Sequence, residues 1–145
     1  MTNKSAKFII YMINELSNVY SCPTSKIYHI LDKVKCIDNY LVPFYDVLHT
    51  MGVEALVDDI TEYICKRSSF ELVKHQTSDK EFTQQIYREH LEEDIIFQIS
   101  KTHKVDLENA MRIYYNSKLA EQVYNNEKSI RHLNYIDLTK TMEQK

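Results

Sequence analysis

The sequence predicts an all-α fold, a compact bundle of about seven to eight short helices. Three observations lead to this prediction. The chain of 145 residues contains one glycine and two prolines, too few for a β architecture that depends on tight turns. Hydrophobic residues make up 43% of it, which is enough to build a core in a domain of this size. Apolar residues recur at steps of three and four along most segments, which is the spacing of one helix face.

Two amphipathic helices are expected at the start of the chain. The apolar residues of "KFIIYMINEL" and its flanks recur at helical spacing and predict a first helix from Lys4 to Tyr20. Pro23 and the serine or threonine that follows it then indicate a helix start, because these residue types favour the first turn and the N-cap. A second helix is therefore expected to start near Ser25 and to end around Lys35.

A third segment and a fourth helix are expected on either side of Gly52, the only glycine. Asp38 is the expected N-cap of the third segment, which tolerates Pro43 in its early turns because no amide donor is needed there. The segment reaches Met51, and Gly52 is expected to end it in the left-handed conformation that glycine adopts easily. The fourth helix follows over residues 53–67 and carries an acidic polar face.

The second half of the chain is expected to begin with a long helix. Asp79 is its predicted N-cap, and apolar residues at helical spacing continue to Ile99. Asp106 is expected to cap the next helix, and a short one should include residues 119–123. Asn134 is the expected cap of the final helix. The inward-facing residues predicted for that helix are Tyr135, Leu138 and Met142.

The chain is expected to consist of two helical units and a connector. Residues 1–67 form the first unit, residues 68–78 lack a clear period and form the connector, and residues 79–145 form the second unit, packed on the first. The stretch "FIIYMI" of the first unit is similar to "DIIFQI" of the second, which suggests an internal duplication. Chance similarity between short amphipathic helices is the alternative interpretation, and the sequence does not decide between them.

Charge and composition exclude several classes of function. The formal net charge of −3 makes nucleic acid an unlikely partner, because proteins that grip phosphate backbones carry a basic surface. No run of about 18 apolar residues predicts a membrane span, so the expected location is the cytoplasm. The three cysteines, Cys22, Cys36 and Cys65, are too far apart to form a zinc pair and are expected to be reduced, with Cys36 and Cys65 in or near the core.

Asp46 and His49 form the strongest candidate for catalysis. They lie three residues apart on one predicted helix face, so the carboxylate could orient the imidazole as a general base. A structural role is favoured, in which Asp46, His49 and Gly52 form a corner between helices and His49 bonds the terminal carbonyls. Among the possible metal ligands, His90 and Asp94 come closest to a metal-binding pair. The sequence contains no glycine-rich loop of the kind that binds phosphate. The sequence therefore predicts no enzyme, no metal and no cofactor.

Eleven tyrosines are the least ordinary feature of the composition. They cannot all be buried in a domain of this size, because each hydroxyl needs a partner or water, so several should lie at the surface. Tyrosines beside acidic helices suit a protein partner with a basic cleft. Simple replacement of phenylalanine by tyrosine is the alternative explanation. The predicted partner-binding residues are Tyr45, Asp58, Asp59, Glu62, Tyr63, Glu89, Glu92 and Glu93.

The segment "IDNYLVPFYDVLHTMGVEALVDDI" resembles a family of small, functionally uncharacterised bacterial helical proteins that is common in gut Firmicutes. The resemblance covers roughly the first 67 residues. The residues that carry it are Tyr45, Asp46, Leu48, His49, Thr50, Gly52, Val57, Asp58, Asp59 and Ile60. The second half, "EEDIIFQISKTHKVDLENAMRIYYNSKLAEQVYN", is similar to a companion family of short helical proteins from the same gene neighbourhoods.

The resemblance implies a function as an antitoxin. Genes of these families often stand beside genes for proteins similar to ADP-ribosyltransferases, an arrangement that resembles a toxin and its antidote. The implied function is a non-enzymatic protein-binding module that neutralises this neighbouring-gene toxin by occluding its cleft. Two alternatives are kept: a transcriptional or DNA-associated adaptor, for which Lys118, Lys128, Arg131 and His132 would supply positive charge, and a structural homodimer.

Overall fold

The structure is a computed structural model that describes residues 1–70, 72–74, 78–131 and 133–143. These residues form eight α-helices, one π-helical turn and no strand, so the all-α prediction is confirmed. The elements are α1 (Asn3–Tyr20), α2 (Thr24–Lys33), η1 (Ile37–Leu41), α3 (Tyr45–Leu48), α4 (Val53–Arg67), α5 (Asp79–His103), α6 (Leu107–Tyr115), α7 (Lys118–Tyr124) and α8 (Tyr135–Glu143).

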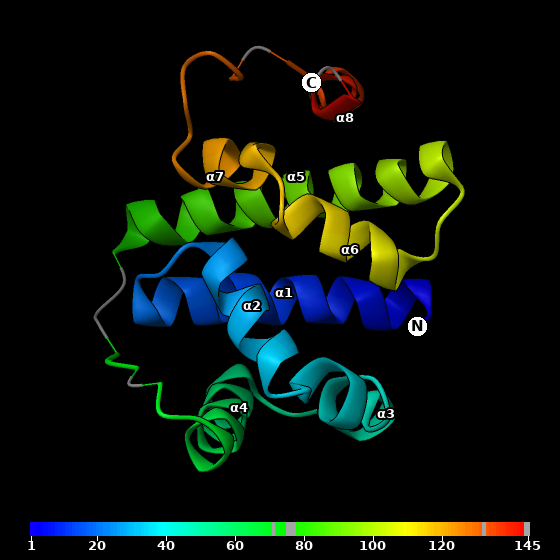
Figure 1. The fold of residues 1–145 in the computed structure, drawn as a ribbon. Coiled ribbons are helices and arrows are strands. Elements are labelled where there is room, and N and C mark those ends of the chain that lie inside the picture. Colours follow the sequence, from blue (N-terminus) through cyan, green and yellow to red (C-terminus); the bar gives the residue numbers. More distant parts are fainter. Residues whose placement is uncertain (71, 75–77, 132, 144–145) are drawn as a thin grey trace.

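The long helices α1 and α5 lie side by side at the centre of the molecule (Figure 1). Helices α2 and α6 cross in front of this pair and contact each other, while α7 and α8 pack on the far side of α5. Helices α3 and α4 lie at the opposite end, below α1 in the view of Figure 1. The buried apolar residues of both halves of the chain form one continuous core. Burial of this shared core is the main favourable contribution to folding.

Side chains at the helix starts explain most of the boundaries. Asp106 Oδ1 accepts a hydrogen bond from the Asn109 amide at 2.8 Å, and Asn134 Oδ1 accepts one from the Asp137 amide at 2.9 Å, as expected for N-caps. The expected cap Asp79 is wrong by one residue. Ser78 caps α5 instead, because its hydroxyl accepts from the Glu81 amide at 3.2 Å.

The segment before Gly52 is not the single helix predicted from Asp38. It forms η1 and then α3, and Asp38 lies inside the first turn of η1. Pro43 explains the interruption, because it lacks an amide hydrogen and its ring conflicts with a carbonyl of the preceding helical turn. Gly52 also differs from expectation. Its φ of −68° is an ordinary value, and it serves as the N-cap of α4.

Tyrosine burial follows the expected division between core and surface. The buried tyrosines are Tyr20, Tyr28, Tyr114 and Tyr115. The Tyr28 and Tyr115 rings stack with 4.8 Å between their centroids and join α2 to α6. Tyr135 was expected to face inward but is 37% exposed, and Cys65 is exposed rather than near the core. Only Cys36 of that predicted pair is buried.

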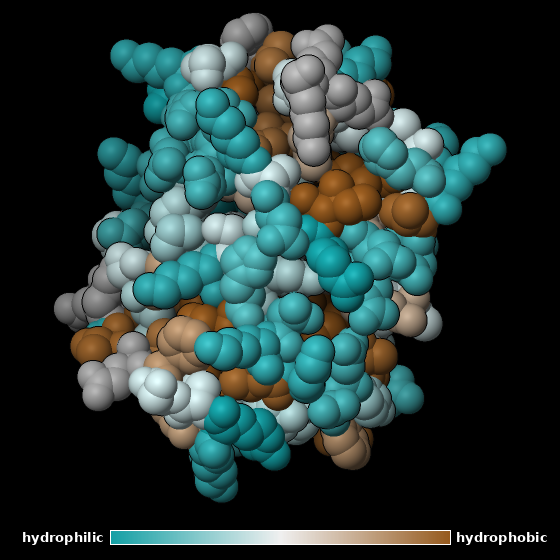
Figure 2. Space-filling view, viewed as in Figure 1, coloured by the Kyte–Doolittle hydropathy of each residue, from teal (hydrophilic) through white to brown (hydrophobic). Residues whose placement is uncertain are grey.

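The surface shown in Figure 2 alternates between hydrophilic areas and several separate hydrophobic patches. Such separate patches are common on soluble proteins and require no explanation singly. Within the described part of the chain, no helix combines the length and apolar character needed to cross a bilayer.

Candidate protein-binding surface

The residues of η1 and α3 present apolar and aromatic side chains to solvent. Leu41 and Leu48 point into the core and hold the two short elements against the bundle. Phe44 lies between Leu41 and Leu48 in the chain, and Val47 directly precedes Leu48. Both side chains face solvent and are 53% and 62% exposed, respectively. Both lie within the segment from Asp38 to Met51 that was expected to be continuous. The helix break at Pro43 directs both side chains to the surface. Apolar spacing alone did not predict their exposure, whereas Pro43 was the feature of the sequence that indicated the break.

Ring contacts extend this exposed area in two directions. The Tyr40 ring lies 6.0 Å from that of Phe44 and stacks on Tyr63 of α4 at 5.4 Å, both measured between centroids. The Tyr45 ring stacks on His49 at 4.6 Å and meets Phe8 of α1 edge-on at 5.5 Å. We call the residues Tyr40, Phe44, Tyr45, Val47, His49 and Tyr63 the aromatic surface. Most of its rings are held by a neighbouring ring, so a partner would meet a largely ordered surface.

A shallow groove of about 350 Å³ borders the aromatic surface. It runs over α1, with Tyr45 and His49 of α3 on one side and Glu89 and Glu93 of α5 on the other. Three predicted partner-binding residues, Tyr45, Glu89 and Glu93, are thus brought together from the two halves of the chain. Lys7 of α1 also lines the groove, and its Nζ lies 3.5 Å from Glu93 Oε1.

Glu89 is the titratable group of this groove with a shifted pKa near neutrality. Burial, more than any other cause, raises the pKa of its carboxyl to about 7. The negative charges of Glu15, Glu93 and Glu92 raise it further, whereas His90 opposes them. Near neutral pH the groove therefore carries less negative charge than its carboxyl count indicates.

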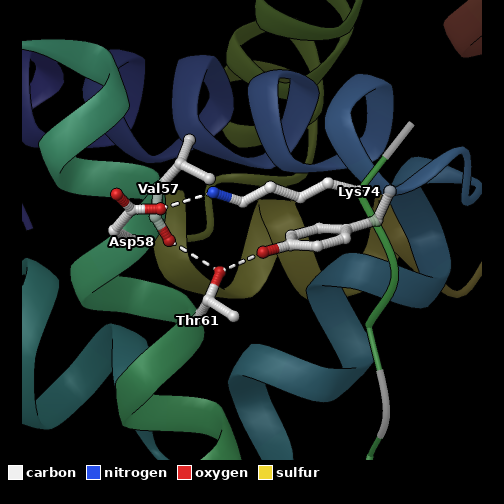
Figure 3. Close-up of polar contacts among 5 residues, drawn as sticks. Val57, Asp58, Thr61 and Lys74 are labelled. Carbon is white, nitrogen blue, oxygen red and sulfur yellow. Dashed lines mark hydrogen bonds and ion pairs between the residues drawn. The ribbon is translucent and has the colours of Figure 1, made fainter. Parts of the chain in front are cut away.

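Three more of the predicted acidic residues, Asp58, Asp59 and Glu62, lie on α4, and lysines of the same chain neutralise two of them. Lys74 Nζ donates to Asp58 Oδ1 at 2.5 Å, next to the hydrogen bond of 2.6 Å from Thr61 Oγ1 to the Val57 carbonyl (Figure 3). Lys66 Nζ lies 2.7 Å from Glu62 Oε1, and its hydrogen bond lowers the pKa of that carboxyl. The attraction of α4 for a partner with a basic cleft is correspondingly reduced.

Asp59 and Tyr63 complete the α4 part of the prediction. Asp59 is half-buried, and after burial its charge is the next largest cause of the raised pKa of the Tyr40 hydroxyl. The Tyr63 ring lies beneath the Arg67 guanidinium, whose central carbon is 3.6 Å from the ring centroid. Tyr63 thus belongs to the aromatic surface and Asp59 lies beside it, and neither residue lines the groove.

Glu92 was expected at the surface together with Glu89 and Glu93. This expectation is wrong, because the Glu92 side chain is completely buried. Four donors surround the carboxylate. Asn14 Nδ2 and Thr24 Oγ1 donate to it at 2.8 Å, and the hydroxyls of Tyr114 and Tyr115 donate at 3.1 Å. These residues come from α1, α2 and α6 and meet α5 at Glu92. We call the five residues the Glu92 cluster.

Burial raises the pKa of Glu92, and the hydrogen bonds from Thr24 and Asn14 oppose that effect. Glu92 also lies three and four residues before Ile95 and Ile96, which are buried on the same side of α5. Helical spacing therefore contained the signal for its burial. The burial of Glu92 was not predicted because the surrounding segment "EHLEED" is rich in acidic residues, which is typical of an exposed helix face.

Asp46 and His49, the candidate catalytic pair, lie at the surface in and just after α3. Both are exposed, and His49 Nδ1 contacts the Tyr45 backbone carbonyl at 2.8 Å, in agreement with its expected role at a helix end. In the described ranges, no group of three or more histidine, cysteine, aspartate or glutamate side chains is arranged to hold a metal ion. His75 and His132 lie outside the described residues.

Comparison with known proteins gives one match. No curated protein and no solved structure matches the chain. Residues 7–67, which run from α1 to the end of α4 and include the whole aromatic surface, match the model of a family described as a protein of unknown function, DUF3791.

Proposed function

We propose that the protein is a non-enzymatic, antitoxin-like binding module that neutralises an ADP-ribosyltransferase-like partner by occluding its cleft. The observation that supports binding is the exposure of Phe44 and Val47 within the aromatic surface. The partner class and the bacterial setting follow from the sequence resemblance described above, and the cytoplasmic location is the expectation from the lack of a long apolar run in the sequence.

The aromatic surface has the composition of a binding site. Buried aromatic side chains at the centre of an interface commonly contribute most of its binding energy. Tyr45 is held between Phe8 and His49, and Tyr40 between Phe44 and Tyr63, so association would order few further side chains. Phe44 and Val47 are the residues that a partner would cover.

Charge is a secondary contribution to this proposal. Lysines of the same chain pair with Asp58, Glu62 and Glu93, which leaves fewer unpaired carboxylates to attract a basic partner. The net charge of −3 still favours a partner of positive potential. We therefore expect affinity to depend more on apolar contact at the aromatic surface than on salt concentration.

Co-expression with each adjacent gene, followed by co-purification and biolayer interferometry, tests the proposal. Replacing Phe44 by Asp should weaken the complex roughly 30-fold, the effect of losing an interface contact of about 2 kcal/mol. Phe82→Asp is the matched control, because Phe82 is 52% exposed on α5, outside both the aromatic surface and the groove. The same ratio should appear in inhibition of ADP-ribosyl transfer by the purified partner.

Two results would contradict the proposal, and two others would favour an alternative function. Recovery of no adjacent gene product would remove its main support, and equal effects of the two substitutions would place binding elsewhere. A gel shift of the upstream DNA at micromolar protein would instead favour the DNA-associated adaptor. Concentration-dependent mass in light scattering, without a heterologous partner, would favour the homodimer.

A further inference from the structure

A hollow of about 320 Å³ lies on the opposite side of α5 from the groove, and no function described so far uses it. It is formed by the N-terminal half of α5, the end of α7 and the turn that follows α7. Two arginines, Arg88 and Arg131, line it together with Tyr87 and Tyr124. Neither arginine has a carboxylate within ion-pairing distance among the described residues, although the chain carries a net charge of −3.

Arg88 lines this hollow and carries an unsatisfied donor. Its Nε donates to Asn14 Oδ1 at 2.8 Å, and its guanidinium carbon lies 5.1 Å from the centroid of the Tyr124 ring. Its Nη2 is buried and has no hydrogen-bond partner. Buried donors in folded proteins nearly always have an acceptor, and leaving one unpaired is costly. An anion that settles beside Arg88, with a small shift of the Tyr124 ring, would supply the missing acceptor.

Arg131 is held at the same hollow by the chain turn after α7. Its Nε donates to the Asn126 carbonyl at 2.9 Å. This turn closes the end of α7: Asn126 adopts a left-handed φ of 52°, and two backbone bonds, Asn126 N to Val123 O and Glu127 N to Gln122 O, are both 3.1 Å long. A terminal guanidinium fork on a fixed turn is suited to a phosphate or carboxylate.

The rest of the wall is aromatic and apolar. Tyr87 is 61% exposed, Tyr124 is half-buried, and Leu91, Val123 and Ile130 complete the lining. Tyrosine faces beside apolar side chains accept a planar ring by stacking. A volume of about 320 Å³ is at the lower end for small-molecule sites and accommodates one ring with a small substituent.

We propose that this hollow binds a small anion that carries a planar ring, with Arg88 and Arg131 at the phosphate or carboxylate and Tyr87 and Tyr124 at the ring. The two arginines make the site selective for negative charge, and the two tyrosines make it selective for a ring over the free anion. The site is separate from the aromatic surface, so it stands whether or not the protein binds a toxin.

Titration with phenyl phosphate, followed by nuclear magnetic resonance of the labelled full chain, tests the proposal. We expect a dissociation constant below 1 mM (an affinity of about 4 kcal/mol or more) and shifts centred on Tyr124, Arg88 and Asn126. Arg131→Gln should weaken binding about tenfold through loss of one charged contact. Lys128→Gln is the matched control, because it removes the same charge from the same turn at an exposed residue outside the lining, and it should change binding less than twofold.

Inorganic phosphate and benzoate separate the two parts of the site. Benzoate should bind at the same residues, which would extend the anion class to carboxylates, and inorganic phosphate should bind at least tenfold more weakly than phenyl phosphate. Equal affinity for inorganic and phenyl phosphate would refute the role of the tyrosines. Shifts located elsewhere, no binding at 10 mM (an affinity under about 3 kcal/mol), or equal effects of the two substitutions would refute the site.

Discussion

Replacement of Glu92 by leucine should destabilise the fold severely. The substitution keeps a side chain of similar size but removes the carboxylate that accepts from the two tyrosine hydroxyls of the Glu92 cluster. It likewise leaves the donated hydrogens of Asn14 and Thr24 facing an apolar group. All four donors are buried, so water cannot replace the lost acceptor without opening the core.

The magnitude follows from the number of donors. Each buried donor left without an acceptor costs about 1 kcal/mol at the low end of the measured range, which gives about 4 kcal/mol for four. Leucine avoids the cost of burying a carboxylate, and this offsets about 1 kcal/mol or more. The net loss of about 3 kcal/mol corresponds to a decrease in melting temperature of roughly 10 °C for a chain of this length.

Thermal and urea denaturation followed by circular dichroism would measure this loss. Glu92→Gln should cost only about 1–2 kcal/mol, because the amide oxygen keeps two donors and the rotatable hydroxyls accept from the amide group. Asp94→Leu, a comparable change from an acidic residue to leucine at an exposed position two residues along α5, should stay within about 0.5 kcal/mol. A Glu92→Leu variant as stable as Asp94→Leu would refute the argument that the cluster holds four helices together.

Two further predictions concern the pKa of Glu89 and the backbone at Gly52. The pKa of Glu89 is about 7 in the folded protein against an ordinary 4.5, so the folded state retains a proton that the unfolded chain has already lost. This contribution to stability is complete below about pH 4.5 and is lost as the pH rises through 7. The melting temperature of Glu89→Gln relative to the parent should therefore increase between pH 4.5 and 8, and an unchanged difference would contradict the burial of this carboxyl. Gly52→Ser should stabilise the protein by about 0.5 kcal/mol in urea denaturation, because Gly52 has φ −68°, no atom within 4 Å of an added Cβ, and an N-cap position without a side-chain acceptor. A loss above about 1 kcal/mol would indicate a left-handed φ in solution.

Local patterns in the sequence were sufficient to predict most of the helices. The caps Asp106 and Asn134 act within three residues of themselves, so their roles depend on short stretches of chain. Ser78 was missed in favour of Asp79 because both residue types cap helices well, and only the backbone geometry selects between them.

The candidate sites depended on contacts that no local pattern contains. The groove joins Tyr45 to Glu89 and Glu93, which are more than forty residues later in the chain, and only the packing of α5 on α1 brings them together. The acceptor role of Glu92 likewise requires donors from three other helices. Periodicity could have predicted that Glu92 is buried. Periodicity could not have predicted which side chains donate hydrogen bonds to the Glu92 carboxylate.

The pairing of α1 with α5 bears on how the two halves depend on each other. Asn14 and Thr24 of the first half donate hydrogen bonds to the carboxylate of Glu92, which belongs to the second half. The apolar faces of both halves also share one core. A polypeptide that carried only the segment from α1 to α4 would leave the α5-facing side of α1 in water. Such a short protein would need a separate helical chain, or another molecule of itself, to complete its interior. Fusion into one chain makes this assembly independent of protein concentration.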